Sequence, residues 1–288
     1  MAVRLSAALV ALALLVFVPS ALADSAASTN WAGYAVHRPR LSFRTVEGGW
    51  RQPGVVCHPG LRTFSSYWVG LGGFSESSQA IEQIGTEADC TRNGRLASTA
   101  WYELLPAPSV PISLPIHPGD LMRAGVAVSG HAVFFTLEDV TTRHGFSRTV
   151  PAPDVDLSSA EWILEAPSNC LSLTDCMTLP LADFHSATFT GAVAETARGH
   201  WGTISDPRWD TTRIALDPGA GAGVSASRAG SGLLGAVPGL LTATGSAFTV
   251  QRAAINLAAG TGAAPVAGSS APAAANPLGA IQLRPEIR

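Results

Sequence analysis

The residues best suited to chemistry lie in the short run 161–165, which reads Glu-Trp-Ile-Leu-Glu. Side chains alternate between the two faces of a β-strand, so Glu161 and Glu165 share one face and Trp162 and Leu164 share the other. This pattern fits an amphipathic surface strand with two solvated glutamates, or a strand whose carboxylate acts as a general base. The run alone leaves both interpretations open.

Two further runs place polar groups on strand faces. In the run 81–87, Gln83 and Glu87 share a face, with a glycine between them that leaves open space beside the amide. In the run 98–105, Trp101 and Glu103 share a face. Large flat side chains that could line a cleft or fill a core are those of Trp31, Trp50, Trp68, Trp101 and Trp162.

Other common catalytic signatures are missing from the sequence. It contains no G-x-S-x-G elbow, no H-E-x-x-H zinc helix and no phosphate-binding P-loop. The seven histidines are scattered without metal-ligand spacing, so we expect neither a metal nor a cofactor. A formal net charge of −3, spread without runs, argues against nucleic acid as a partner.

The chain is long enough for one large or two ordinary domains, with 288 residues of which 47% are hydrophobic. Residues 1–23 have the pattern of a signal peptide, with Arg4, an apolar run and the small-residue site Ala21-Leu22-Ala23. We therefore expect a secreted, extracellular protein that leaves the membrane after cleavage. Residues 24–252 form the expected domain, and the Ala-, Gly- and Pro-rich residues 253–288 form a flexible tail.

Short β-rich runs between Gly, Pro, Asn and Ser clusters predict an all-β fold, either a sandwich or a barrel. The expected strands are Asn30–Val36, Phe43–Arg51, Ser65–Gly70, Ile81–Glu87, Ser98–Leu105, Leu121–Val128, His131–Val140, Phe146–Val150, Glu161–Glu165, Ala182–Thr190, Thr211–Leu216 and Ala247–Arg252. Asn93-Gly94, Pro118-Gly119-Asp120 and Ser129-Gly130 are turn signals. The segment Gly219–Leu241 is interpreted as a long ordered loop.

Four cysteines in an exported chain fit two disulfides better than a thiolate metal site. Four cysteines can pair in three ways. We expect sequential pairing, Cys57 with Cys90 and Cys170 with Cys176.

Several segments together resemble the eqolisin family of glutamic peptidases. They are Thr29-Asn30-Trp31-Ala32-Gly33-Tyr34, Gly48-Gly49-Trp50, Tyr67-Trp68-Val69-Gly70-Leu71, Glu82-Gln83-Ile84-Gly85-Thr86-Glu87, Ala100-Trp101-Tyr102-Glu103, Pro118-Gly119-Asp120, Ala160–Pro167 and Leu181-Ala182-Asp183-Phe184. In order and spacing they cover nearly all of residues 28–252. The resemblance implies a two-sheet antiparallel sandwich, a concanavalin A-like jelly roll, with the active site on its concave face.

By motif, the resemblance implies that Gln83 and Glu161 form the catalytic pair, with Glu165 as the alternative to Glu161. The substrate cleft would then contain Trp31, Trp68, Glu87, Trp101, Glu103 and Glu165. A glutamate can act as general base on a water that attacks a peptide carbonyl. The amide of Gln83 would stabilise the oxyanion. An ordinary glutamate pKa of about 4.3 suits this chemistry to acid, so we expect a monomeric acid endopeptidase that acts on polypeptides.

Two departures from the family's fungal members qualify this expectation. Those members have an acidic residue where this chain has Gly72, so we expect one cleft carboxylate fewer and a shifted acid optimum. The first family motif also begins a few residues after the expected cleavage site, which predicts a mature enzyme without a sizeable pro-segment.

Two other functions stay open from the residues alone. A sandwich-fold glycoside hydrolase would also use paired carboxylates and cleft tryptophans. Glu161 and Glu165 lie roughly 13 Å apart along a strand, so such an enzyme would have to pair Glu161 with Glu103 or Glu87. The other possibility is a non-catalytic module that binds carbohydrate or peptide.

Overall fold

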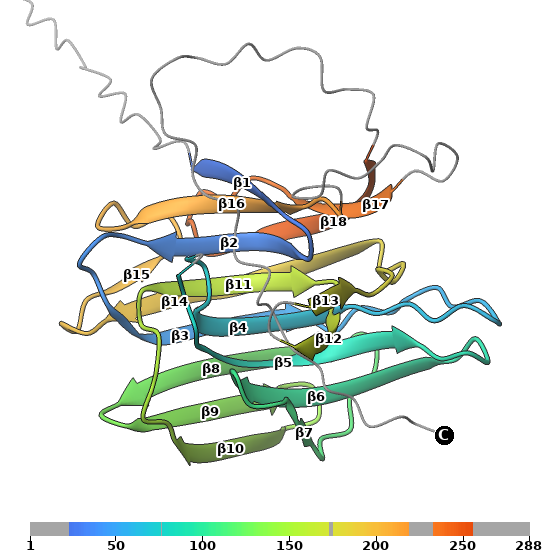
Figure 1. Ribbon diagram of the computed structural model, residues 1–288, viewed down its shortest axis with the longest axis horizontal. Helices are drawn as coiled ribbons and strands as arrows, with labels where there is room; N and C mark the ends of the chain where they lie inside the picture. The colour runs from blue at the N-terminus through green and yellow to red at the C-terminus, as the bar shows by residue number, and fades with distance from the viewer. Residues whose placement is uncertain (1–22, 76, 173–174, 219–232, 256–288) are drawn as a thin grey trace, which may run out of the picture.

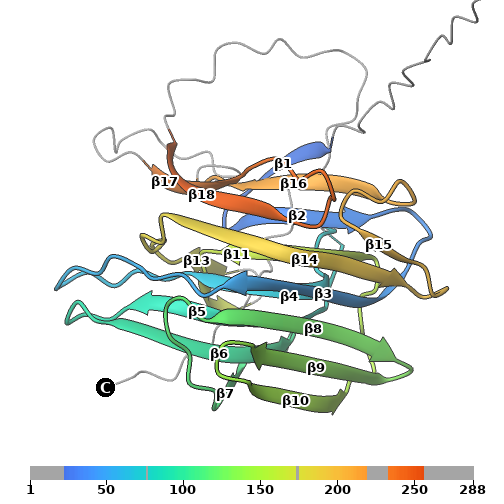
Figure 2. The ribbon, with the colours of Figure 1, turned by 180° about the vertical axis from the view of Figure 1, so that it is seen from behind.

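The protein folds as two stacked layers of β-strands (Figures 1 and 2), as expected from the sequence. A computed structural model describes residues 23–75, 77–172, 175–218 and 233–255. The expected signal peptide, apart from Ala23, lies outside the described residues, and so do residues 256–288 of the expected tail. No helix among the described residues is long and apolar enough to cross a membrane.

The first layer, which faces the viewer in Figure 1, has the strand order β16-β2-β11-β4-β5-β6-β7. Its strands are β16 (Asp210–Leu216), β2 (Trp31–His37), β11 (Ser159–Glu165), β4 (Ser66–Gly72), β5 (Ile81–Cys90), β6 (Leu96–Leu104) and β7 (Val110–Ile112). Every neighbouring pair in this order is antiparallel. A short strand, β1 (Asp24–Ser28), adds to β16 in parallel.

The second layer has the order β10-β9-β8-β3-β14-β18 and is seen from behind in Figure 2. Its strands are β10 (His144–Pro151), β9 (Ala132–Asp139), β8 (Leu121–Ser129), β3 (Phe43–Arg51), β14 (Ser186–Thr196) and β18 (Phe248–Ile255). β17 (Leu233–Pro238) pairs with both β18 and β16, so hydrogen bonding continues from one layer into the other. β15 (Trp201–Thr203) pairs with β14, and β12 (Ser168–Ser172) with β13 (Asp175–Thr178) makes a separate hairpin.

The main hydrophobic core lies between the layers. It includes Trp50 from the second layer and Trp162 from the first, both at most 1% exposed. Each indole N–H finds a partner there: Trp50 donates to Thr86 Oγ1 at 2.9 Å, and Trp162 donates to the backbone oxygen of Glu47 at 2.8 Å. These two tryptophans are therefore core residues and do not line a cleft.

Each expected strand is present, with its ends displaced by a few residues. The strands that the sequence did not predict are β1, β7, β12, β13, β15 and β17. Most of these are short or rich in small residues, so they carry little alternation. The interpretation of 219–241 as a loop was wrong for residues 233–238, which form β17, while 219–232 lie outside the described residues. The last strand also runs to Ile255, beyond the expected end at Arg252.

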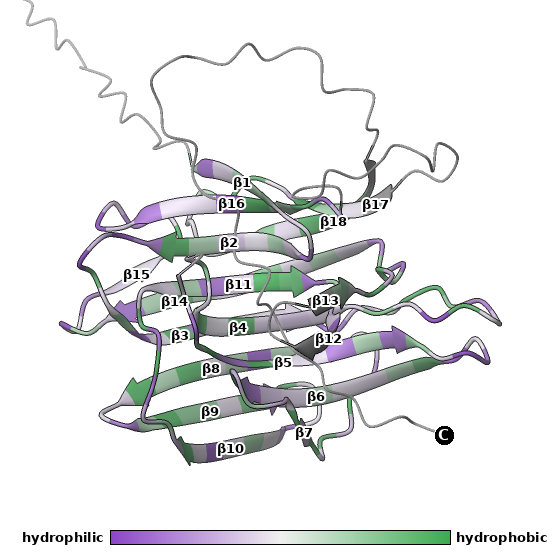
Figure 3. Ribbon diagram, viewed as in Figure 1, coloured by the Kyte–Doolittle hydropathy of each residue, from purple (hydrophilic) through white to green (hydrophobic). Residues whose placement is uncertain are grey.

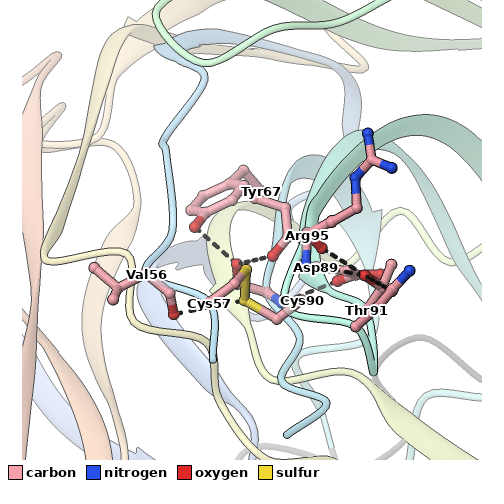
Figure 4. The surroundings of a disulfide bond; sticks show 10 residues. Val56, Cys57, Tyr67, Asp89, Cys90, Thr91 and Arg95 are labelled. Carbon is pink, nitrogen blue, oxygen red and sulfur yellow. Dashed lines mark hydrogen bonds between the residues drawn. A yellow bond between two sulfur atoms is a disulfide. The ribbon is translucent and has the colours of Figure 1, made fainter. Parts of the chain in front are cut away.

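The disulfide between Cys57 and Cys90 is confirmed, with the two Cα atoms 5.3 Å apart (Figure 4). It ties the segment before β4 to the end of β5. The backbone of β12 and β13 places Cys170 opposite Cys176, as a bridge would require. Their side chains lie outside the described part of the chain, so the second bridge stays a prediction.

Candidate active site

Glu161 and Gln83 come from different strands and meet across a glycine. Glu161 on β11 and Gln83 on β5 are both directly opposite Gly70 of β4, which runs between them. Neighbouring strands lie about 4.8 Å apart, so the two backbones are roughly 10 Å apart. Gly70 carries no side chain, and thus position 70 itself places nothing between the carboxylate and the amide, although the Trp68 ring of the same strand comes within 3.0 Å of where a Cβ would lie.

The other expected cleft residues share this face. Residues that lie opposite one another on neighbouring strands form two further rows across the sheet. One row contains Ile163, Trp68, Gly85 and Trp101, and the other contains Trp31, Glu165, Ser66, Glu87 and Thr99. Side chains two residues apart on a strand point to the same side, so the face carries all eight residues predicted from the sequence. This face, called here the active face, is the one turned away from the core between the layers.

A second hydrophobic cluster builds the active face. Its members include Trp31, Trp68, Trp101 and Ile163. Trp31 and Trp68 meet edge to face, with ring centroids 5.0 Å apart. Because both faces of β11 are buried, the interpretation of 161–165 as a surface strand with solvated glutamates is wrong.

The two glutamates of β11 have different surroundings. Glu165 accepts hydrogen bonds on both oxygens, from Asn30 Nδ2 at 3.0 Å and from Trp68 Nε1 at 2.8 Å. Neither oxygen of Glu161 meets a hydrogen-bond partner among the described residues, although its side chain is 0% exposed. Glu161 is therefore free to bind a water, whereas Glu165 is committed to holding Asn30 and Trp68.

Gln83 is oriented by a carboxyl group in its own row. Its Nε2 donates to Glu103 Oε2 at 2.6 Å, and Glu103 lies directly opposite it on β6. An amide nitrogen has two N–H groups, so one stays available on the active face. In the outer row, Glu87 accepts a hydrogen bond from the Thr99 hydroxyl at 3.0 Å.

Burial raises the pKa of the carboxyl groups on this face. The pKa of Glu161 lies well above its usual range because its carboxyl is buried, and the carboxyls of Asp156 and Glu82 add to the rise. The nearby Ser159 hydroxyl opposes this rise, although it is not placed to make a hydrogen bond. Burial raises the pKa of Glu165 to about 8.

The same effect acts on Glu103. Burial holds the pKa of Glu103 well above its usual range, and the hydrogen bond from Gln83 only partly opposes this. A buried charge without a full set of partners is costly, so these carboxyls keep their protons to higher pH than in water. The described residues contain no group of three or more His, Cys, Asp or Glu side chains that could hold a metal ion.

Some site residues were not found from the sequence. Asn30 stands in a family segment, but its partner Glu165 is 135 residues away. Glu82 is next to Gln83 on β5 and so lies on the opposite face of the strand, where it is only 1% exposed and burial raises its pKa to about 9. Asp156 lies in a segment that no motif marked.

Comparison with solved structures shows that other proteins share this fold. The chain resembles the crystal structure of scytalido-glutamic peptidase with a transition state analog inhibitor, at 21% identity, with a TM-score of 0.61. That match covers 78% of this chain and 98% of the other. The chain also resembles SCP-B, a member of the eqolisin family solved with the tripeptide Ala-Ile-His. That match has 20% identity and a TM-score of 0.50, and it covers 79% and 98% of the two chains. At such identities, these likenesses show the fold.

A search of curated protein sequences found no match. The sequence model of the peptidase A4 family matches residues 29–217, which is more than half of the 288 residues. The chain therefore belongs to the peptidase A4 family and is a glutamic endopeptidase, as its motifs predicted.

Proposed function

We propose that this peptidase is exported and cleaves peptide bonds with Glu161 as general base and Gln83 as oxyanion donor. The ionised Glu161 takes a proton from a water molecule while the water oxygen attacks the carbon of the peptide carbonyl. Glu161 later returns that proton to the leaving amine. The free N–H of Gln83 donates to the oxygen that becomes negative. An amide donor keeps its proton at any pH, which a carboxyl group cannot do.

The observation that carries this proposal is that Glu161 and Gln83 both lie opposite Gly70. A substrate carbonyl and a water between them would meet a base on one side and a donor on the other. Glu165 is less suited to act as the base because both of its oxygens already accept hydrogen bonds.

The raised pKa of Glu161 sharpens the expected pH dependence. A general base works only when ionised, so activity falls as the pH drops through the pKa of Glu161. An ordinary glutamate would allow activity in strong acid. Because burial raises this pKa well above the usual range of a glutamate, we expect the acid limb of kcat/KM to lie at higher pH than an ordinary glutamate would give.

Glu103 sets the limit of activity at high pH. While protonated, it holds the Gln83 amide without adding charge. Once ionised, it binds that amide more tightly and places a negative charge beside the forming oxyanion, which destabilises the transition state. We therefore expect activity to require an ionised Glu161 and a protonated Glu103.

The test uses protein collected from the culture medium of an expressing host, with its N-terminus sequenced to check cleavage after Ala23. Denatured casein is incubated with it between about pH 2 and 8, with pepstatin and a metal chelator present. We expect proteolysis by the wild type. Glu161→Ala should lower kcat by about 10²–10⁴ and Gln83→Ala by about 10²–10³.

The matched control is Glu138→Ala, which removes an exposed carboxyl from the outer face of β9 and should keep full activity. Absence of proteolysis by the wild type, or full activity in both active-face variants, would refute the proposal. Hydrolysis of polysaccharide in place of casein would point to a glycosidase.

A further inference from the structure

Gly72 lies at the end of β4, where the sequence led us to expect one carboxylate fewer. Its φ of +75° is in the left-handed region, and a Cβ built on it would lie 2.6 Å from the Cβ of Asp156. The backbone oxygen of Asp156 would be equally close. Asp156, from the connection between β10 and β11, therefore fills the space that a side chain at position 72 would need.

Asp156 is held there by hydrogen bonds from two segments. Its Oδ2 accepts from the Ser78 hydroxyl and from the Gly73 N–H, the latter at 3.4 Å. Its Oδ1 accepts from the Ser158 N–H at 2.9 Å. The carboxyl thus joins the β4–β5 connection, which leads to Gln83, with the start of β11, which carries Glu161.

Asp156 also contacts the buried carboxyl on the core side of β5. The Asp156 backbone lies close enough to the Glu82 carboxyl to lower its pKa, which burial raises to about 9. The charge of Asp156 is among the causes that raise the pKa of Glu82 and of Glu161, after burial itself. The site therefore has an acidic neighbour that comes from a loop and not from β4.

We propose that Asp156 is a positioning residue for Glu161, which sets the alignment and the electrostatic environment of the base from outside the strand. This deepens the proposed function and rests on it. The titratable groups near Asp156 are Glu161 on β11, Glu82 on β5, and Asp154 and His131, which line the same open hollow of about 570 Å³. On β2, His37 lies two residues from Ala35, which is opposite Glu161.

The experiment follows the Glu161 carboxyl directly by ¹³C NMR titration, with its resonance assigned by its loss in Glu161→Gln. In Asp156→Asn the negative charge is gone, so the Glu161 midpoint should fall by about half a pH unit or more. In Ser78→Ala the Asp156 carboxylate keeps its charge but loses the hydrogen bond from the Ser78 hydroxyl, so the Glu161 midpoint should rise. Asp156→Glu should restore the wild-type midpoint in part.

The matched control is Asp154→Asn, an exposed carboxyl on the same connection, which should leave the Glu161 midpoint unchanged. The acid limb of kcat/KM should move with the midpoint in each variant. An unchanged midpoint in both Asp156→Asn and Ser78→Ala, with only a lower Tm, would show a merely structural role and overturn the proposal. If Asp156→Asn fails to fold, the upward shift in Ser78→Ala decides.

The NMR titration does not depend on catalytic turnover. The proposed function and the proposed role of Asp156 can therefore be refuted independently of each other. A wild type without peptidase activity refutes the proposed function, while the NMR midpoints still show whether Asp156 acts on Glu161.

Discussion

β9 and β11 carry glutamates on the outer faces of the two layers, and the two strands read alike at first sight. Both combine apolar residues with acidic ones, and Figure 3 shows hydrophobic and hydrophilic stretches along the strands of the sandwich. On β9 the outward residues Phe134, Thr136 and Glu138 are exposed. On β11 every residue is buried, including Glu161 and Glu165.

Cross-strand neighbours account for this difference. Glu138 lies opposite Arg123 and Gly145, at a surface open to water. Glu161 lies opposite Ala35 and Gly70, neither of which offers a charge or a side-chain hydrogen bond. The same residue type is therefore a solvated surface group on one layer and a buried acid with a raised pKa on the other. Alternation identifies a face, but the neighbouring strands decide whether water reaches it.

The largest effect within this comparison is expected when a glycine on the outer face of the first layer is replaced by alanine. Gly70→Ala adds a Cβ about 3.2 Å from the Cβ of Gln83 and 3.0 Å from the Trp68 ring, on the strand that runs between Glu161 and Gln83. We expect kcat/KM to fall by about tenfold to a hundredfold, because small displacements of reacting groups are costly. Casein hydrolysis at the optimum pH measures this.

The matched variant is Gly125→Ala on β8 of the second layer, whose Cβ would lie 3.0 Å from Thr136 Oγ1. It introduces a similarly tight contact on the other outer face, so Tm should change by a similar small amount while activity stays at the wild-type level. Equal loss of activity in both variants would mean that Gly70 matters only for folding.

Much of the fold could be predicted because its strands carry strong local signals. Turn glycines at positive φ, such as Gly94 and Gly130, mark hairpins that the dipeptides Asn-Gly and Ser-Gly had indicated. β17 could not be predicted in the same way, because its sequence Leu-Leu-Gly-Ala-Val-Pro has no alternation of apolar and polar residues and contains glycine and proline, which are depleted in strands.

In the candidate site, too, local sequence predicted some features, whereas others depend on the packed sheet. Motifs marked Gln83 and Glu161, and alternation put them on consistent faces, but neither gives the register that sets both opposite Gly70. The roles of Asn30 and Asp156 depend on contacts between segments far apart in the chain, which no local pattern encodes. Burial of the active face, and with it the raised pKa values, likewise follows only from the packed sheet.

A smaller effect is expected from the Glu103 carboxyl, which accepts a hydrogen bond from the Gln83 amide. Glu103→Gln keeps a carbonyl oxygen for the Gln83 N–H but cannot ionise. Activity in weak acid should stay within a few-fold of wild type, and the alkaline limb of kcat/KM should move to higher pH. The pH profile on a peptide substrate measures both. An alkaline limb that stays in place would show that another group causes it.

The smallest effect concerns stability, where the two faces should differ in their response to pH. Burial raises the pKa of Glu165 to about 8 and that of Glu82 to about 9, both above the value of about 4.5 in the unfolded chain. A raised carboxyl pKa means that the folded state holds its proton more tightly. Its contribution is complete below about pH 4.5 and is lost as the pH rises toward 8 or 9.

Tm should therefore fall by several degrees between about pH 4.5 and pH 8, measured by calorimetry at constant ionic strength. Glu165→Gln should reduce this fall, because the amide never ionises, while Glu138→Gln on the exposed face of β9 should leave it unchanged. The amide also loses one of the hydrogen bonds to Asn30 or Trp68, because its NH2 group cannot accept, and this lowers Tm at every pH without changing the slope. The slope is thus the measurement that separates the charge of Glu165 from its hydrogen bonds, and an unchanged slope would show that its carboxyl is ionised in the folded protein.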